Sequence, residues 1–242
     1  MKVLDLTLPS PAENLACDEA LLDAAESGEA GEVLRFWESR QPFVVVGYAN
    51  QVTVESNVAL CAAKSIPILR RCSGGGSVVQ GPGCLNYALV LRITADGPTR
   101  NISATNEFIM ARNRAAIQSA LLPPLPEVRV RGYTDLTVGD KKFSGNSQRR
   151  RRKFLLFHGT FLWNFDLRLI GEVLLMPPRQ PSYRQARAHG DFIANLSLSA
   201  KKLKEALRQA WQVDGALTET PAAGIAELVR EKYSLPEWNL KF

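Results

Sequence analysis

The amino-acid sequence predicts an α+β fold, in which a mixed and largely antiparallel sheet is flanked by helices. Strand-like and helix-like segments are intermingled, but they lack the regular strand–helix alternation of a doubly wound fold. Several strand-like segments follow one another across short turns, which favours antiparallel pairing. With 242 residues, 45% of them apolar, the chain can bury a substantial core. We therefore expect residues 1–242 to form one domain.

The helix predictions rest on apolar residues that recur at helical spacing. The clearest example is residues 106–122, and Pro123 and Pro124 are expected to end that helix, because proline cannot continue one. The other expected helices are residues 14–26, 54–65, 197–212 and 222–233.

The strand predictions rest on short runs rich in β-branched and other apolar residues, which are favoured in sheets. These runs are residues 43–47, 66–72, 77–79, 85–93, 127–147 and 153–165. Within residues 127–147 the polar and apolar residues alternate, and Gly139-Asp140 predicts a hairpin turn. The proline-rich residues 174–185 are expected to form a loop, either over a site or across the surface.

Composition narrows the cellular setting and the kinds of cofactor. No apolar run approaches the roughly 20 residues of a membrane-spanning helix, and the first residues carry acidic side chains where a signal peptide has an apolar core. The sequence therefore predicts a soluble, cytoplasmic protein with no membrane partner. Four cysteines without CxxC spacing and two histidines argue against a disulfide scaffold and a Cys/His metal site.

The net charge is +6, and much of the excess lies in RRRRK, residues 149–153. Such a surplus favours anionic ligands, among them nucleotides, acidic proteins and nucleic acid. A nucleic-acid site would interleave stacking aromatic residues with the basic run. The aromatic residues after position 153 alternate as strand-core residues do, which argues against nucleic acid. A solvated charged loop and the steering of an acidic partner by Arg150 and Arg151 remain open.

Three segments contain residues suited to chemistry, and the first is RRCSGGGSVVQGPGCLNY, residues 70–87. Glycines lack Cβ atoms, so backbone N–H groups can approach an anion closely, and Arg70 and Arg71 add positive charge. The spacing is neither that of a P-loop nor that of a GxGxxG dinucleotide motif. The alternative is a hairpin turn with incidental arginines.

The second segment is TDLTVGDKKFSGNSQ, residues 134–148, which contains an aspartate and two adjacent lysines. A lysine beside a phosphate can stabilise charge on phosphorus or on an acyl oxygen, although an ordinary surface hairpin is the alternative. The third segment is FLLFHGTFLW, residues 154–163, where His158 interrupts an apolar strand. A lone histidine in that setting is more often a hydrogen-bonded core residue than a catalyst.

These three segments occur together with NLACDEALL at residues 14–22, LRFWESRQPFVVVGYANQ at 34–51 and DFIANLS at 191–197. In this order and spacing they resemble lipoate–protein ligases, a family within the superfamily of biotin–protein ligases and octanoyl transferases. The resemblance covers residues 15–198, and its motifs are specific as a set. It implies a biotin/lipoate protein ligase-like catalytic domain that activates lipoate or octanoate with ATP and Mg²⁺. The acyl group of the resulting lipoyl-AMP would pass to a lysine of a lipoyl domain or a glycine-cleavage H-like protein.

The resemblance also assigns site residues by position. It implies that Lys142, directly before the apolar residue and the Ser-Gly step, is the catalytic lysine in preference to Lys141. It implies that Asp135 helps to hold Mg²⁺. The residues expected to contact ATP are Arg71, Gly75, Gly76, Ser77, Val78 and Val79, with Lys142 and Asp135 beside them. A side chain at Gly75 is expected to collide with the adenylate while leaving the fold intact.

The chain departs from the family pattern in three ways, one of which is the run RRRRK at residues 149–153, which is more basic than the family needs. Many members carry His-Asp where this chain has Gln80-Gly81-Pro82, and glutamine can form hydrogen bonds but cannot titrate. Larger ligases add a C-terminal accessory domain, and none is expected here. Adenylation could then require a separate accessory protein, or the protein could be a transferase only.

The main alternative within the superfamily is an ATP-independent octanoyl or lipoyl transferase that acts through a cysteine thioester. Those enzymes carry a cysteine shortly before the lysine motif, and VRVRGYTDLTVGDKK, residues 128–142, contains none. Cys72 and Cys84 are expected to be structural. Biotin ligation would require a GRGRxGR-type loop, which is absent, and a non-catalytic protein that binds lipoyl-AMP or a partner stays open. The sequence does not determine the acyl-chain preference or the oligomeric state.

Overall fold

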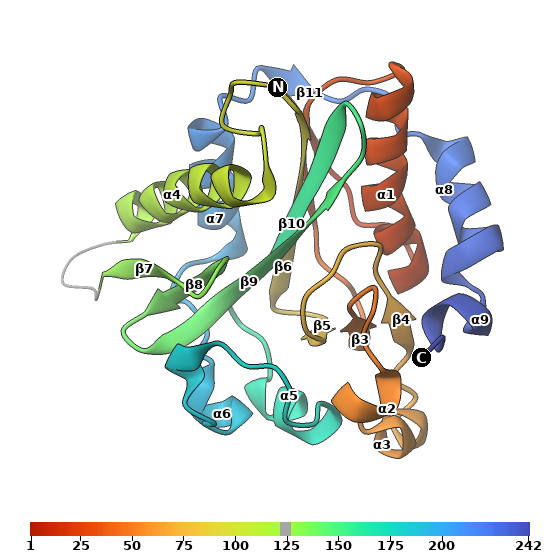
Figure 1. The fold of residues 1–242 in the computed structure, drawn as a ribbon, viewed down its shortest axis with the longest axis vertical. Coiled ribbons are helices and arrows are strands. Elements are labelled where there is room, and N and C mark those ends of the chain that lie inside the picture. Colours follow the sequence, from red (N-terminus) through yellow and green to blue (C-terminus); the bar gives the residue numbers. More distant parts are fainter. Residues whose placement is uncertain (122–126) are drawn as a thin grey trace.

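The computed structural model describes residues 1–121 and 127–242, and within these residues the strands form two sheets (Figure 1). The large sheet has eight strands in the order β11-β1-β2-β6-β10-β9-β8-β7, and the small sheet has three in the order β4-β3-β5. The strands of the large sheet are β1 (Lys2–Asp5), β2 (Val33–Trp37), β6 (Cys84–Arg92), β7 (Val128–Arg131), β8 (Asp135–Val138), β9 (Lys141–Arg150), β10 (Phe154–Leu162) and β11 (Gly215–Ala216). Those of the small sheet are β3 (Phe43–Val46), β4 (Ile68–Arg70) and β5 (Val78–Gln80).

The large sheet is mixed, because β1 pairs in parallel with β2 and β11 while the strands from β2 through β6 to β7 pair antiparallel. Its centre is the pair β6 and β10, which stay in register from Phe154 opposite Arg92 to Leu162 opposite Cys84. The predicted α+β class, with a largely antiparallel sheet, is confirmed.

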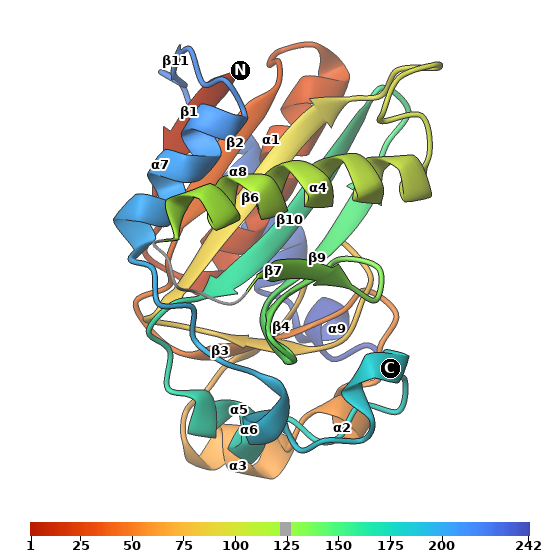
Figure 2. The ribbon, with the colours of Figure 1, turned by 90° about the vertical axis from the view of Figure 1, so that its left-hand side faces the viewer.

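Helices cover both faces of the large sheet (Figure 2). On one face, α4 (Ile102–Ala120) and α7 (Ala200–Ala210) bury residues such as Ile109 and Leu203 against Leu89 and Phe157. On the other face, α1 (Pro11–Ser27) and α8 (Ala222–Leu228) pack on side chains that include Leu156. Leu156 and Phe157 are neighbours on β10, and their opposite directions follow from the two-residue period of a strand.

The remaining helical elements are short, and several lie near the small sheet. They are α2 (Val52–Glu55), α3 (Val58–Ala63), α5 (Leu167–Val173), the 3₁₀ helix η1 (Ser182–Arg184), α6 (His189–Phe192), the π-helical turn η2 (Val229–Tyr233) and α9 (Pro236–Asn239). The expected helix over residues 54–65 is therefore two helices, and residues 222–233 form α8 followed by η2. No helix among residues 1–121 and 127–242 has the combination of length and apolarity that crossing a bilayer would require.

Local signals explain where the long helices begin. Helix α1 starts with a capping box, in which the Ser10 side chain accepts from the Glu13 N–H and Glu13 accepts from the Ser10 N–H. It ends at Gly28, whose φ of 93° is left-handed. Helix α4 starts earlier than residue 106, because the Asn101 side chain caps it by accepting from the Ala104 N–H. The expected end at Pro123-Pro124 lies outside the described residues.

The basic run at residues 149–153 comprises the end of β9 and the connection from β9 to β10, and this connection lies against the carboxylates of α1. Arg151 forms an ion pair with Asp23 at 2.9 Å, and the Lys153 N–H donates to Glu26 at 2.9 Å. Arg150 donates to the Thr99 carbonyl at 2.8 Å. Part of this charge is therefore compensated within the chain, and the steering of a partner by Arg150 and Arg151 stays a prediction.

A buried ion pair joins α1 to the large sheet. The Arg35 side chain is fully buried; it contacts Asp18 and donates at 2.8 Å to both the carbonyl and the side-chain oxygen of Asn14. Burial alone would raise the pKa of Asp18, but Arg35 and His158 outweigh burial and lower it.

Replacing Arg35 by methionine is expected to lower the free energy of unfolding by about 3–5 kcal/mol, because Asp18 would remain buried without its main partner. The Asp18→Asn/Arg35→Met double variant should recover most of that loss. The pKa of Asp18 is lower in the folded protein than in the unfolded chain. Its contribution to the free energy of unfolding is therefore complete above about pH 4 and is lost as the pH falls through the folded-state pKa. Urea unfolding of both variants between pH 3 and pH 7 measures these effects, and a loss below 1 kcal/mol for Arg35→Met would contradict the assignment.

Candidate functional site

A cavity of about 680 Å³ lies between the α1-side face of the large sheet and the small sheet. Its lining includes Val45 and Val79 of the small sheet and His158 and Thr160 of β10. His158 and Thr160 share a face with Leu156, which packs against α1, because alternate residues of a strand point the same way. The volume is within the range of small-molecule sites in proteins.

The lining of the cavity is polar in its centre and apolar in two separate parts. Residues of three adjacent strands form the centre, since Thr160 is paired with Asn86 of β6 and with Gly145 of β9, and the Lys142 amine lies over Gly145. One apolar part belongs to the core cluster of α1, and the other belongs to the cluster around α5 and α6. The first part contains Leu15, Trp37 and Val45, and the second contains Leu162, Ile170, Leu174, Phe192 and Ile193.

The glycine loop, residues 73–77, connects β4 to β5 and closes one side of the cavity. Gly47 allows it to come close, because a Cβ atom on Gly47 would lie 1.9 Å from the Gly75 carbonyl oxygen. The Asn50 side chain donates to that oxygen at 3.0 Å, and the Tyr48 N–H donates to the Ser73 carbonyl at 2.9 Å. These contacts fix the conformation of the loop, which is therefore not a flexible turn.

Gly75 and Gly76 both line the cavity, but they tolerate a side chain differently. Gly75 has a φ of 88°, and a Cβ atom there would lie 3.0 Å from the Arg71 guanidinium. Gly76 does not have a left-handed φ, and its Cβ would meet no atom within 4 Å among the described residues. A substitution at Gly75 would thus strain the loop itself. A side chain at Gly76 would not strain the loop, so this position tests whether a ligand lies against the loop.

The two arginines before the loop have different roles. Arg71 lines the cavity and holds the loop: it donates to the Ser73 hydroxyl at 3.1 Å and to the Gly76 carbonyl at 3.0 Å. Burial lowers the pKa of Arg71 to about 10, so the guanidinium remains charged at neutral pH. Arg70 is fully buried outside the cavity lining and donates to backbone carbonyls such as those of Gly47 and Lys241. Contact of Arg71 with ATP stays a prediction.

Ser77, Val78 and Val79 also line the cavity, and their contact with a ligand stays a prediction. The Ser77 N–H and hydroxyl donate to the Glu55 carboxylate at 2.8 and 2.6 Å, and Asn50 donates to the same carboxylate. Glu55 therefore holds the end of the glycine loop. Sequence reasoning missed it, because a glutamate in a short helix carries no distinctive pattern.

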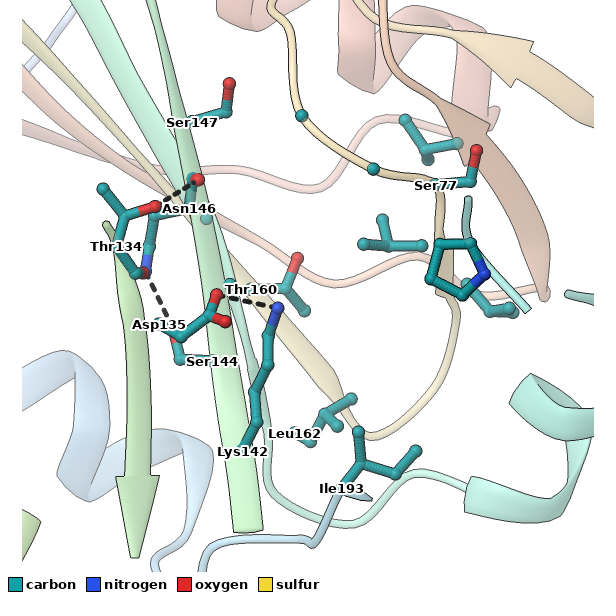
Figure 3. A pocket seen from close by; sticks show the side chains of 18 of the residues that line it. Ser77, Thr134, Asp135, Lys142, Ser144, Asn146, Ser147, Thr160, Leu162 and Ile193 are labelled. Carbon is teal, nitrogen blue, oxygen red and sulfur yellow. Dashed lines mark hydrogen bonds and ion pairs between the residues drawn. The ribbon is translucent and has the colours of Figure 1, made fainter. Parts of the chain in front are cut away.

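Lys142 and Asp135 project toward one another from the neighbouring strands β9 and β8 (Figure 3). The Lys142 Nζ lies 2.8 Å from Asp135 Oδ1, and both side chains are largely buried. The Tyr183 hydroxyl donates to Asp135 Oδ2 at 2.7 Å, and burial and the neighbouring carboxylate raise the pKa of Tyr183. Lys141 is exposed and is not part of the lining, so Lys142 is the lysine that reaches the cavity.

Tyr183 belongs to the proline-rich residues 174–185, which the sequence left open between a loop over a site and a surface crossing. Pro177, Gln180 and Pro181 of this segment line the cavity, so the segment lies over the site. Tyr183 was not identified from the sequence, because its contact with Asp135 joins residues far apart in the chain.

Asp135 was the expected Mg²⁺ ligand, and the surrounding donors fit a magnesium held mainly by a nucleotide. Within the described residues there is no group of three or more His, Cys, Asp or Glu side chains placed to hold a metal ion. Mg²⁺ often takes only one or two carboxylates and completes its shell with phosphate oxygens and water. Asp135 would have to exchange a contact with Lys142 or Tyr183 for the metal, and this role stays a prediction.

His158 is partly buried and hydrogen-bonded, and it lies in the cavity lining. Its Nε2 lies 2.6 Å from the Ser73 hydroxyl, and its Nδ1 lies 3.3 Å from Asp18. It thereby connects the glycine loop to the Asp18–Arg35 pair under α1.

The described cavity lining contains no cysteine. All four cysteines are buried, and burial raises the pKa of the Cys17 thiol to about 11 and that of Cys72 to about 12; the pKa of Cys61 and Cys84 is raised as well. Since the thiolate is the nucleophilic form, these thiols are poorly suited to forming a thioester. The expectation that Cys72 and Cys84 are structural agrees with their burial.

Comparison with known proteins places this geometry in a family. The model of the lipoyl protein ligase A/B catalytic domain matches residues 10–213. Lipoate-protein ligase A subunit 1 of Thermoplasma acidophilum is 26% identical over 240 residues, which cover 94% of this chain and 91% of that protein. Octanoyltransferase LipM of Brevibacillus brevis is 23% identical over 266 residues, covering 96% and 95%.

Solved structures agree with the predicted fold. The crystal structure of lipoate-protein ligase A bound with ATP has a TM-score of 0.78 and 26% identity, covering 99% of this chain and 98% of that one. A bipartite lipoate protein ligase from Thermoplasma acidophilum, studied with its E2 lipoyl domain, has a TM-score of 0.80 and 24% identity, covering 99% and 95%. Because the family match takes in both the glycine loop and the Lys142 strand, the chain belongs to the lipoyl protein ligase A/B catalytic domain family.

Proposed function

We propose that this protein is an ATP-dependent lipoate–protein ligase that activates lipoate or octanoate and transfers the acyl group to a lysine. The observation that carries the proposal is the placement of Lys142 at the polar centre of a cavity with two apolar parts. An acyl-adenylate has the same arrangement, because an apolar tail and an aromatic base lie on either side of a charged acyl phosphate. Each buried CH₂ of the tail would contribute about 0.8 kcal/mol.

The chemistry requires two anions to meet. In the first step a carboxylate oxygen attacks the α-phosphorus of ATP and pyrophosphate leaves. In the second step the lysine amine attacks the acyl carbon, the acyl–phosphate bond breaks and AMP leaves with the electron pair, while the amine loses one proton. Lys142 would donate hydrogen bonds to the oxygens on which charge develops, and Arg71 would hold the glycine loop against the adenylate. Bound Mg²⁺ would add positive charge beside the phosphates, with Asp135 as its protein ligand.

A cysteine-dependent transferase is the second candidate, and the similarity to octanoyltransferase LipM favours it. Such an enzyme needs a reactive thiol next to the acyl group. The burial of Cys17, Cys61, Cys72 and Cys84 and the absence of cysteine from the described lining support the ligase instead.

The acceptor that we propose is a lipoyl domain or a glycine-cleavage H-like protein, in the cytoplasm. The Thermoplasma acidophilum ligase is described as bipartite and was studied with its E2 lipoyl domain. By analogy, a separate accessory protein could be required here for the adenylation step but not for transfer from lipoyl-AMP.

Release of pyrophosphate from Mg-ATP tests the proposal directly. Release that depends on added lipoate or octanoate is expected of a ligase. If none is released but a lipoyl domain is modified from presynthesised lipoyl-AMP, adenylation needs an accessory protein. Modification from an acyl thioester without ATP would instead establish the transferase.

The Gly145→Ala variant tests whether the position of Lys142 matters. The new Cβ would lie 2.8 Å from Lys142 Nζ and 3.7 Å from Asp135 Oδ1, so the flexible lysine must move while the fold is kept. A displacement of about 1 Å can cost on the order of 100-fold in rate, and a loss of this size is expected in transfer from lipoyl-AMP. Gly31→Ala, at a glycine whose Cβ would meet no described atom within 4 Å, is the control that should keep full activity. Full activity of Gly145→Ala would contradict the prediction.

A further inference from the structure

The Gln80 side chain carries an acceptor that the cavity leaves unsatisfied. Gln80 is 7% exposed and lines the cavity at the end of β5. Its Oε1 is buried and has no hydrogen-bond partner among the described residues. Buried polar atoms in native proteins are nearly always paired, so an orphan atom at a ligand cavity points to a partner that arrives with the ligand.

A hydrogen-bond chain fixes which end of the Gln80 amide is free. The Thr160 hydroxyl has a single proton, which it donates to Asn86 Oδ1 at 2.7 Å. Thr160 Oγ1 therefore accepts from Gln80 Nε2 at 3.2 Å. The amide nitrogen is thus engaged, and the free group of Gln80 is the carbonyl oxygen, which can only accept.

The Gln80 side chain lies near the proposed reacting centre. Thr160, which accepts from its amide nitrogen, is paired with Gly145 of β9. Lys142 Nζ lies directly over Gly145, because a Cβ atom on that glycine would be 2.8 Å from it.

Few groups of the reactants could donate a hydrogen bond at this place. The acyl tail has no strong donor, and carboxylate and phosphate oxygens are acceptors at neutral pH. The adenine amino group lies at the far edge of the base, away from the phosphates. The donors that could reach this point are a ribose hydroxyl and the attacking amine, and of these the amine has to meet the acyl carbon.

We propose that Gln80 Oε1 accepts an N–H of the acceptor protein's lysine amine and so orients its lone pair toward the acyl carbon. This inference rests on the proposed function and concerns only its second step. The amide is not a base: as the carbon–nitrogen bond forms and AMP leaves, the amine's lost proton goes to solvent or to the departing phosphate. Gln80 is a binding residue for the nucleophile, with no need for a group that titrates.

The test separates the two half-reactions in Gln80→Met and Gln80→Glu. Adenylation is followed as pyrophosphate release from Mg-ATP and lipoate, and transfer as single-turnover modification of a lipoyl domain from presynthesised lipoyl-AMP. Gln80→Met removes the acceptor and should slow transfer at least tenfold while changing adenylation less than twofold. Gln80→Glu keeps a hydrogen-bond acceptor but loses the donor to Thr160. Its rate of acyl transfer should stay within about threefold of the wild-type rate. Gln148→Met, the same change outside the cavity lining, should leave both steps unchanged.

Three results would overturn the inference while leaving the proposed function standing. Equal losses in both steps for Gln80→Met would indicate a ribose contact or a structural role. Equal losses of transfer rate in Gln80→Met and Gln80→Glu would assign the effect to the hydrogen bond with Thr160. Unchanged transfer in Gln80→Met would mean that Oε1 binds only water. If the wild type does not modify a lipoyl domain from lipoyl-AMP at all, the transfer step of the proposed function fails first, and the inference fails with it.

Discussion

Replacing Lys142 by alanine is expected to lower the rate of acyl transfer by about 10²–10³-fold. Lys142 is the lysine that reaches the polar centre of the cavity, and removing one preorganised donor to developing negative charge typically has an effect of this size. The fold should be kept, because the side chain is 25% exposed and its described ion pair is with Asp135 alone. Single-turnover transfer from lipoyl-AMP to a lipoyl domain measures the loss.

Lys141→Ala is the matched control for this prediction. Lys141 precedes Lys142 on the same strand, but it is exposed and lies outside the cavity lining. Its replacement should change the rate less than about twofold. If the two variants are equally impaired, or if Lys142→Ala stays within threefold of the wild type, Lys142 is not the catalytic lysine.

Replacing Gly76 by valine is expected to weaken acyl-adenylate binding by about 5- to 150-fold. The new side chain would meet no described atom within 4 Å in the free protein, so the loop can accept it. It would project from the cavity wall, and extra methyl groups in a well-packed site cost about 1–3 kcal/mol. Calorimetric binding of a non-hydrolysable acyl-adenylate analogue measures the change.

The neighbouring glycines distinguish collision with the ligand from damage to the loop. Gly74→Val adds the same side chain to the same loop at a position with free space that does not line the cavity, and it should bind normally. Gly75→Val should reduce binding and also disturb the loop, because of its left-handed φ and the nearby Arg71 guanidinium. Normal binding by Gly76→Val would show that the ligand does not lie against the loop.

Much of the fold could be predicted because local signals and the global structure agree. The helices α1, α4 and α7 and the long strands β6 and β10 carry clear periodicity, and the turn at Gly139-Asp140 connects β8 to β9 as expected. Strand β2 was not predicted, and neither were the edge strand β11 and its neighbour β1, since four-residue and two-residue strands contain too few residues to show a period. Their place is set by pairing with β2 and with each other, which are contacts between distant parts of the chain.

The residues of the site likewise fall into those that could be predicted from the sequence and those that could not. The predicted residues Arg71, Gly75, Gly76, Ser77, Val78, Val79, Asp135 and Lys142 all line one cavity, because two continuous motifs carry them. The residues that hold them were missed: Glu55 under the loop and Tyr183 against Asp135 act through tertiary hydrogen bonds. Gln80 was visible in the sequence only as a departure from the family pattern. Its unsatisfied oxygen follows from the positions of Thr160 and Asn86 on other strands.

The intact mass of a lipoyl domain, measured after incubation with this protein, Mg-ATP and lipoate, tests most directly whether the cavity serves acyl-adenylate chemistry. We expect the mass of one lipoyl group to be added to the acceptor. The addition should depend on ATP, unless lipoyl-AMP is supplied, and should be lost in Lys142→Ala. Two results would contradict acyl-adenylate chemistry in this cavity. One is a lipoyl domain that stays unmodified with both free lipoate and lipoyl-AMP, and the other is modification from an acyl thioester without any nucleotide.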